Sequence, residues 1–266
     1  MAKAIALFLF LGSMVSASFA QGISVSPSRL FFKGLPGETV TQVITFSNTS
    51  KTEMNFISSI KDWNRDSTGL KQYYPGGQLS SSNAKWLALS SNSVSLAPGE
   101  TKEINLNLKI PNDSTSNRLS NSMLFFTQVK AQKSSARTAN MGVDILFEMG
   151  IQVYHIPEGL SAGELEFLAF EERSQTNSAD TTRKMAVKIK NTGSINKDAY
   201  VRFELTNTSS GEEIQMKPVA IAMLPNAEQW VNLNLPAKLK GKYLVVAILD
   251  AGSQYDLKVA EKEITY

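Results

Sequence analysis

The sequence predicts an all-β protein that consists of two antiparallel β-sandwiches in tandem. Apolar runs of strand length recur along the chain of 266 residues, with turn-forming residues between them. The clearest run is 104–110, in which apolar residues alternate strictly with polar ones, as in a half-buried strand. Helical periodicity is nearly absent, and about seven short strand runs fill the second half, which is typical of an immunoglobulin-like sandwich.

The first 20 residues have the composition of a cleaved signal peptide. Lys3 supplies a positive charge, residues 5–11 are apolar, and Ser18-Phe19-Ala20 places small residues at the cleavage position. The apolar run is too short to span a bilayer. We therefore expect export and cleavage after Ala20.

Proline and glycine residues mark a boundary between two sets of strand runs. Residues 21–157 are the first expected domain, which ends in a long strand from Met141 to Pro157. Residues 158–163 are the expected linker, and residues 164–266 the second immunoglobulin-like domain. At the start of the first domain, Ile23–Phe32 is rich in β-branched and aromatic residues, so we expect one continuous strand there.

The composition argues against several classes of function. The chain has no cysteine, which excludes thiol nucleophiles and zinc–thiolate sites. Its formal net charge is only +3 without a basic cluster, so nucleic acid is not the expected partner. His155 is the single histidine and stands beside Pro157, where we expect a structural role. With no phosphate-binding glycine loop either, we expect no enzyme, no cofactor and no metal, but a protein that binds other polypeptides.

Four segments of the first domain form an ordered set: Ser28–Gly34, Leu96–Gly99, Pro111–Phe126 and Val143–Pro157. In this order they resemble the arginine-bearing first strand, the L-x-P-G turn, the L-P-x-D-R-E-S-L-F segment and the last strand of the PapD-like periplasmic pilus chaperones. The acidic residue after the arginine of the third segment is missing here. The second domain matches this family only in being a sandwich.

The resemblance implies that the chain lends its last strand to an incomplete subunit, a mechanism called donor-strand complementation. By position, the donor side chains are Val143, Ile145 and Phe147, with Met149 as a fourth. Their spacing of two places them on one face of an extended strand. Any strand of a sandwich shows the same alternation, so the residues alone leave a purely structural role open.

The resemblance also implies that Arg29 lies in the cleft between the domains and binds the C-terminal carboxylate of the subunit. A guanidinium suits this task because its planar fork donates two parallel hydrogen bonds. The partner lysine of the family falls on Gln152, which donates a hydrogen bond but has no charge, so we expect a weaker anchor. The alternative for Arg29 is a solvated arginine, or one paired with a nearby acidic residue.

Two functions from different classes follow. The first is a periplasmic chaperone or assembly factor that holds pilin-like or other exported β-rich subunits. The second is a structural or adhesive component of a cell-envelope or secretion complex, favoured by Gln152 and by the unspecific second domain. The first is favoured by Arg29 and by the run Val143–Met149. The two hypotheses differ in whether the strand at Val143–Phe147 has an exposed edge beside Arg29.

Overall fold

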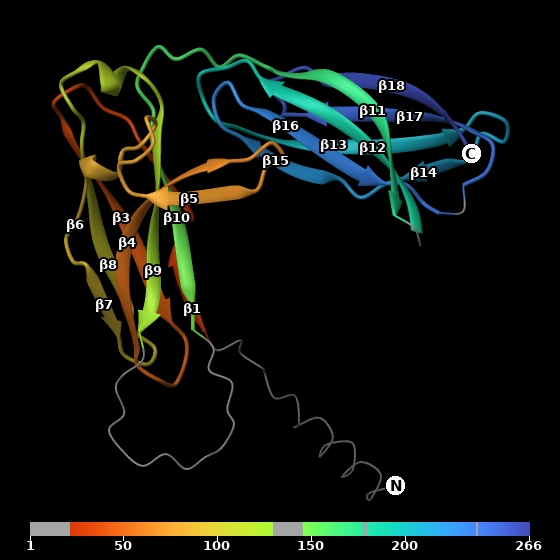
Figure 1. Cartoon of the computed structure of the whole chain (residues 1–266). Coiled ribbons are helices and arrows are strands. Elements are labelled where there is room, and N and C mark those ends of the chain that lie inside the picture. Colours follow the sequence, from red (N-terminus) through yellow and green to blue (C-terminus); the bar gives the residue numbers. More distant parts are fainter. Residues whose placement is uncertain (1–21, 130–145, 178–179, 238) are drawn as a thin grey trace, which may run out of the picture.

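Two β-sandwiches follow each other along the chain in the computed structural model, which describes residues 22–129, 146–177, 180–237 and 239–266. Residues 156–164 join the last strand of the first domain to the first strand of the second. The two sandwiches meet at an angle, so the described part of the chain is bent (Figure 1). The predicted all-β fold with two immunoglobulin-like sandwiches is confirmed.

The first domain has one sheet of four strands and a second, larger sheet. The four-stranded sheet contains, in spatial order, β1 (Ile23–Ser26), β3 (Thr39–Asn48), β8 (Thr101–Lys109) and β6 (Leu87–Leu89). The larger sheet contains, in spatial order, β2 (Arg29–Phe32), β10 (Glu148–His155), β9 (Ser120–Val129), β4 (Met54–Arg65) and β5 (Lys71–Pro75), with β7 (Ser93–Leu96) paired to β4. Short 3₁₀ turns cover Ala84–Trp86 and Ser114–Asn117. Among the described strands of this domain, β2 and β10 pair in parallel and the other strand pairs are antiparallel.

The single strand predicted over Ile23–Phe32 is wrong. The chain forms β1, then crosses at the cis Ser26–Pro27 peptide bond to the other sheet, where it forms β2. Pro27 has no backbone N–H, so it cannot continue a ladder of hydrogen bonds, and the strand ends before it. As a result, β2 begins only at Arg29, and this starting point decides how much of β10 it covers.

The second domain also has two sheets. One contains, in spatial order, β11 (Leu165–Asn177), β12 (Asp180–Asn191) and β16 (Glu228–Asn234). The other contains β14 (Glu213–Gln215), β13 (Lys197–Asn207), β17 (Lys242–Asp250) and β18 (Lys258–Thr265), with β15 (Val219–Met223) paired to β13. Residues such as Val201, Phe203, Val245 and Ala247 point inward and are fully buried, which gives this domain a core of its own.

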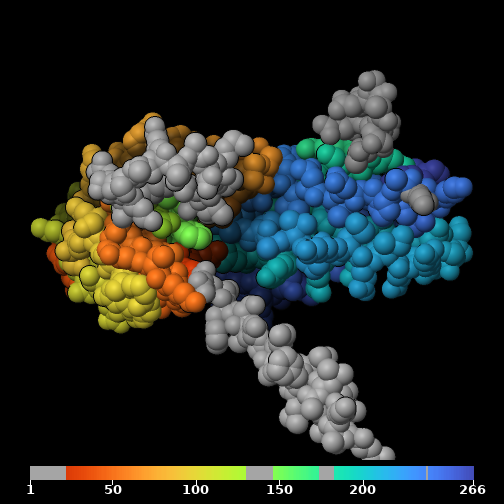
Figure 2. Space-filling view, turned by 90° about the horizontal axis from the view of Figure 1, so that it is seen from below, coloured from red at the N-terminus to blue at the C-terminus, as the bar shows by residue number. Residues whose placement is uncertain are grey.

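Besides the core of each domain, a separate apolar cluster joins the two domains. It contains Trp63, Met123, Phe125 and Tyr154 on the outer face of the larger sheet of the first domain. Second-domain residues, Leu224 among them, pack against this cluster. In the space-filling view the two domains lie against each other along one side (Figure 2).

The hairpin of β4 and β5 adds a second contact between the domains. Its tip reaches the second domain, where the carbonyl of Ser67 accepts a hydrogen bond from the backbone N–H of Trp230 at 2.7 Å. The turn residue Gly69 has a positive φ of 86° and lies against the side chain of Gln229. Because even a Cβ atom at Gly69 would clash with that side chain, the close approach requires glycine.

The predicted signal peptide, residues 1–20, lies outside the described residues. Within the part of the chain that the structure describes, no helix has the length and apolar character needed to cross a membrane.

Candidate functional site

Strand β10 has two halves with different neighbours. Residues Gln152–His155 pair with β2 on one side and with β9 on the other. Residues Glu148–Ile151 pair with β9 alone, because β2 has not yet begun. No other strand among the described residues pairs with this second edge, so the first half of β10 is an open edge of the sheet.

The backbone direction shows which groups this open edge presents. The N–H of Gln152 donates to the carbonyl of Ser28 at 3.0 Å, on the β2 side. The carbonyl of Phe147 accepts from the N–H of Gln128 at 2.8 Å, on the β9 side. Alternate residues of a strand direct their backbone groups to the same side, so Glu148 and Gly150 direct theirs to the open edge. Such a row of unpaired N–H and C=O groups is a template for another strand.

The side chains of β10 leave the core step by step toward its start. Ile151 and Val153 are buried in the core of the first domain, and Met149 is partly buried against that core. Phe147, one step earlier on the same face, is 40% exposed. Val143 and Ile145, the other two predicted donor residues, lie outside the described residues. The bright green atoms at the start of β10 are at the surface in Figure 2.

Arg29 of the first domain contacts the second domain. It opens β2 opposite Gln152, so the two side chains are neighbours on adjacent strands. Because Leu30 is buried in the core, Arg29 projects from the outer face of the sheet. There its Nη1 donates to Oδ2 of Asp198, a residue of β13 in the second domain.

The ion pair of Arg29 with Asp198 is partly solvated. Arg29 is 31% exposed and Asp198 54% exposed at the side chain, and exposed pairs of this kind contribute about 0.2–1 kcal/mol. The hydrogen bond to Asp198 raises the pKa of Arg29 above its ordinary value, so the guanidinium stays charged. The alternative considered from the sequence, an arginine paired with an acidic residue, therefore describes its state in this structure.

Gln152 is half-buried beside Arg29. Its Oε1 accepts a hydrogen bond from the hydroxyl of Tyr154 at 2.6 Å. Among the described residues none accepts a hydrogen bond from its side-chain N–H groups, which leaves them available to an acceptor from outside. The ring of Tyr154 stacks on Phe31 with 5.3 Å between centroids and meets Trp63 edge-on at 6.0 Å. These aromatic contacts fix the position of the Tyr154 ring beside Gln152.

Two cations that the sequence did not point to lie in the same cleft. Arg65 ends β4 and Lys71 begins β5, and the two residues face each other across the hairpin. Both lie near the ring of Trp63, with the Arg65 Cζ at 5.6 Å and the Lys71 Nζ at 5.7 Å from its centroid. Nothing in the spacing of these residues indicates a site, because only the folding of the hairpin brings them beside Arg29.

The pKa values of these two cations are lowered mainly by burial, and nearby positive charge adds to that effect. Burial lowers the pKa of Arg65 from its ordinary value, and the nearby charge of Arg29 lowers it further. Burial also lowers the pKa of Lys71, with the charges of Arg65 and Arg29 acting in the same direction. Three cations therefore share one region of the cleft and repel one another.

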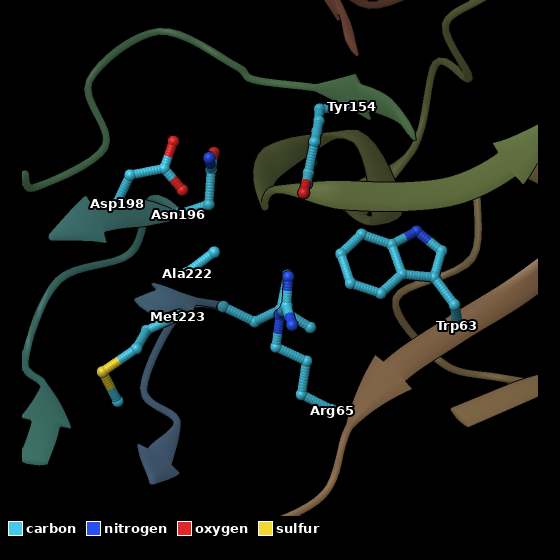
Figure 3. A pocket seen from close by; sticks show the side chains of 8 residues that line it. Trp63, Arg65, Tyr154, Asn196, Asp198, Ala222 and Met223 are labelled. Carbon is cyan, nitrogen blue, oxygen red and sulfur yellow. The ribbon is translucent and has the colours of Figure 1, made fainter. Parts of the chain in front are cut away.

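A narrow seam between the domains is lined by Trp63, Arg65, Tyr154, Asp198 and Ala222, among others. Figure 3 shows the guanidinium of Arg65 and the hydroxyl of Tyr154 directed into this common space, with Asp198 on the second-domain side. As it stands, the seam has no room for a water molecule.

No metal centre is found among the described residues, which contain no group of three or more candidate ligands. His155, for which we expect a structural role, is fully buried and meets Trp86 edge-on with 5.6 Å between ring centroids. Neither of its ring nitrogens has a hydrogen-bond partner among the described residues, and burial lowers its pKa.

No protein-family model matches the chain, and no curated protein matches it. In fold it is similar to solved chaperone structures. One is the CupB2 chaperone of Pseudomonas aeruginosa, with 13% identity over 90% of this chain and 99% of that chain and a TM-score of 0.47. Another is from the CsuC–CsuE chaperone–tip adhesion subunit pre-assembly complex of Acinetobacter baumannii, with 14% identity over 90% of this chain and 97% of that chain and a TM-score of 0.48.

A third similar structure is from the complex of the SafA pilin with the SafB chaperone of Salmonella enterica. It has 14% identity over 92% of this chain and 98% of that chain, and a TM-score of 0.48. At such identities and TM-scores the likeness concerns the fold alone.

Proposed function

We propose that this chain is a periplasmic chaperone that holds exported β-rich subunits by lending them the strand at the start of β10. The observation that carries the proposal is the open edge at Glu148–Ile151, with the exposed Phe147 at its start. An open edge with an exposed aromatic residue is a liability in a free protein, and natural sheets usually protect such edges. Its presence beside a cleft with cationic side chains favours a binding role.

The lent strand offers two kinds of contact. The backbone groups of Glu148 and Gly150 pair with a strand of the client, at about 0.5–1.5 kcal/mol for each hydrogen bond. The side chain of Phe147 enters the apolar groove of the client, and burial of its exposed part contributes about 1 kcal/mol. In this proposal Val143 and Ile145 extend the same apolar row, and Met149 ends it.

In this proposal Arg29 and Gln152 receive the C-terminal carboxylate of the client. Their side chains are neighbours on paired strands, so a carboxylate there can accept from the guanidinium and from the amide N–H. In the free chain Asp198 forms an ion pair with Arg29. Because this pair is weak and partly solvated, replacing Asp198 with the carboxylate of a client costs little free energy.

The second candidate is a structural component of a cell-envelope complex. It is favoured by the apolar cluster that joins the domains and by the ion pair that already occupies Arg29. A rigid spacer has no need of the open edge, so the two functions differ in what a change at Phe147 does.

The test is capture of the tagged protein from its own periplasm after mild crosslinking, followed by mass spectrometry. Phe147→Asp places a charge on the lent strand, and Leu168→Asp is the matched control, because Leu168 is 46% exposed on the second domain. We expect β-rich exported subunits with the wild type and with Leu168→Asp, and their loss with Phe147→Asp. Partners that remain with Phe147→Asp would contradict strand lending and favour the structural component.

A further inference from the structure

The cleft between the domains has more positive than negative charge. Beyond the effect of burial, the charge of Arg29 lowers the pKa of Arg65, and the charges of both arginines lower the pKa of Lys71, whereas Asp198 acts on both arginines in the opposite direction. Asp198 bonds to Arg29. No carboxylate among the described residues forms an ion pair with Arg65 or Lys71. The described part of the cleft therefore has two cations without a counterion.

Arg65 is the less expected of these two cations, because it is half-buried. A half-buried guanidinium needs partners for its donors. It has the carbonyl of Gly69, which accepts from Nη1 at 2.6 Å, and the ring of Trp63. Neither partner carries a charge, so the site retains an unmatched positive potential.

We propose that Arg65 acts with Arg29 as a second cation for the terminal carboxylate of the client, and that Asp198 is an internal carboxylate that fills the site until the client displaces it. This inference rests on the proposed function and adds two residues to it. Arg65 comes from a hairpin of the first domain and Asp198 from the second domain, so the site includes residues of both domains.

The geometry makes the two carboxylates exclude each other. Asp198 lines the seam together with Arg65, and the seam has no room for a water molecule. Nη1 of Arg29, which a carboxylate from outside would bond, is now bonded to Asp198, and a seam without free space admits that carboxylate only when side chains that line it move. Asp198 is 54% exposed and can turn into solvent, so its departure requires no unfolding of the domain. The free energy with which the client carboxylate binds is then the difference between the free energies of two competing ion pairs.

The test uses a soluble, fluorescently labelled peptide of alternating valine and threonine residues, made with a free C-terminal carboxylate and, separately, with a C-terminal amide. Fluorescence anisotropy gives the Kd of each peptide for the full mature chain. We expect the acid to bind about tenfold more tightly than the amide. Arg65→Gln reduces this acid-to-amide ratio about fivefold, and Asp198→Asn raises the affinity for the acid about threefold without changing that for the amide.

Two variants separate charge from structure. Arg65→Lys keeps the charge and loses the fork, so it restores part of the ratio that Arg65→Gln loses. Lys109→Gln removes an exposed cation from β8, in the four-stranded sheet on the other side of the first domain, and leaves the ratio unchanged.

The outcomes distinguish this inference from the proposed function. An acid-to-amide ratio that is the same in the wild type, Arg65→Gln and Asp198→Asn would overturn the inference. If Phe147→Asp still removes binding of both peptides, strand lending stands without the two-arginine site. Failure of both peptides to bind the wild type at millimolar concentration would overturn the inference together with strand lending.

Discussion

The two halves of β10 belong to one strand, yet they have different environments. In Gln152–His155 both edges are paired, and Val153, Tyr154 and His155 are buried. In Glu148–Ile151 one edge is open, and Phe147 just before it is exposed. The difference arises outside β10, at Pro27, where the neighbouring chain changes sheets and delays the start of β2. The open edge of β10 therefore exists because the neighbouring strand β2 is too short to cover it.

The largest expected effect comes from placing the same charge in each half. Val153→Asp puts a carboxylate into the core of the first domain, and we expect a loss of roughly 3–5 kcal/mol in the free energy of unfolding. Phe147→Asp changes a partly exposed position, and we expect a change within about 0.5 kcal/mol. Urea unfolding followed by far-ultraviolet circular dichroism measures both. Equal losses in the two variants would show that the first half is as much a part of the core as the second.

A smaller effect concerns pH, because only the second half contains a buried titratable group whose pKa is lowered. His155 is buried, which lowers its pKa below the ordinary value of 6.5. As pH falls through about 6.5, the unfolded chain takes up a proton that the folded chain does not, so stability falls, by at most about 1.4 kcal/mol per pH unit. Above that pH both states are neutral at His155, and its contribution is constant.

The check is unfolding by urea at a series of pH values from about 7 to about 5. His155→Gln removes the titrating ring, so this variant loses the decline between these values. If His155→Gln shows the same decline as the wild type, other groups cause it and the buried His155 does not.

A small effect on stability is also expected from the contact that joins β2 to the second domain. Asp198→Asn removes one partner of the partly solvated ion pair with Arg29, and we expect a loss of less than about 1 kcal/mol. The difference from the wild type disappears in high salt, because salt screens exposed charges. A loss of several kcal/mol in the urea midpoint would mean that this pair is structural and does not exchange with a client.

Much of the fold is predictable from the sequence, because local patterns determine it. The alternation over 104–110 predicts a half-buried strand, and β8 covers nearly all of that run. The expectation of one strand over Ile23–Phe32 failed because Pro27 interrupts a run whose side chains otherwise suit a strand. Apolar pattern reports which face of a strand is buried, whereas one missing N–H decided where this strand ended.

The candidate site is only half predictable, for a different reason. Arg29 and Gln152 follow from their places in the motifs, and the structure makes them neighbours. Arg65 and Asp198 have no local signal, since they reach the cleft through the β4–β5 hairpin and through the packing of the second domain. Contacts between elements distant in sequence depend on topology, which residue spacing does not encode.

The most direct test of strand lending is amide hydrogen exchange at single residues, measured by NMR for the free chain and with the free-acid peptide at saturation. In the free chain, we expect the amides of Glu148 and Gly150 to exchange fast and those of Gln152 and Tyr154 to be protected by β2. With the peptide, the first two amides slow about tenfold or more, and the other two change little. Protection of Glu148 and Gly150 in the free chain, or no slowing with the peptide, would contradict the account.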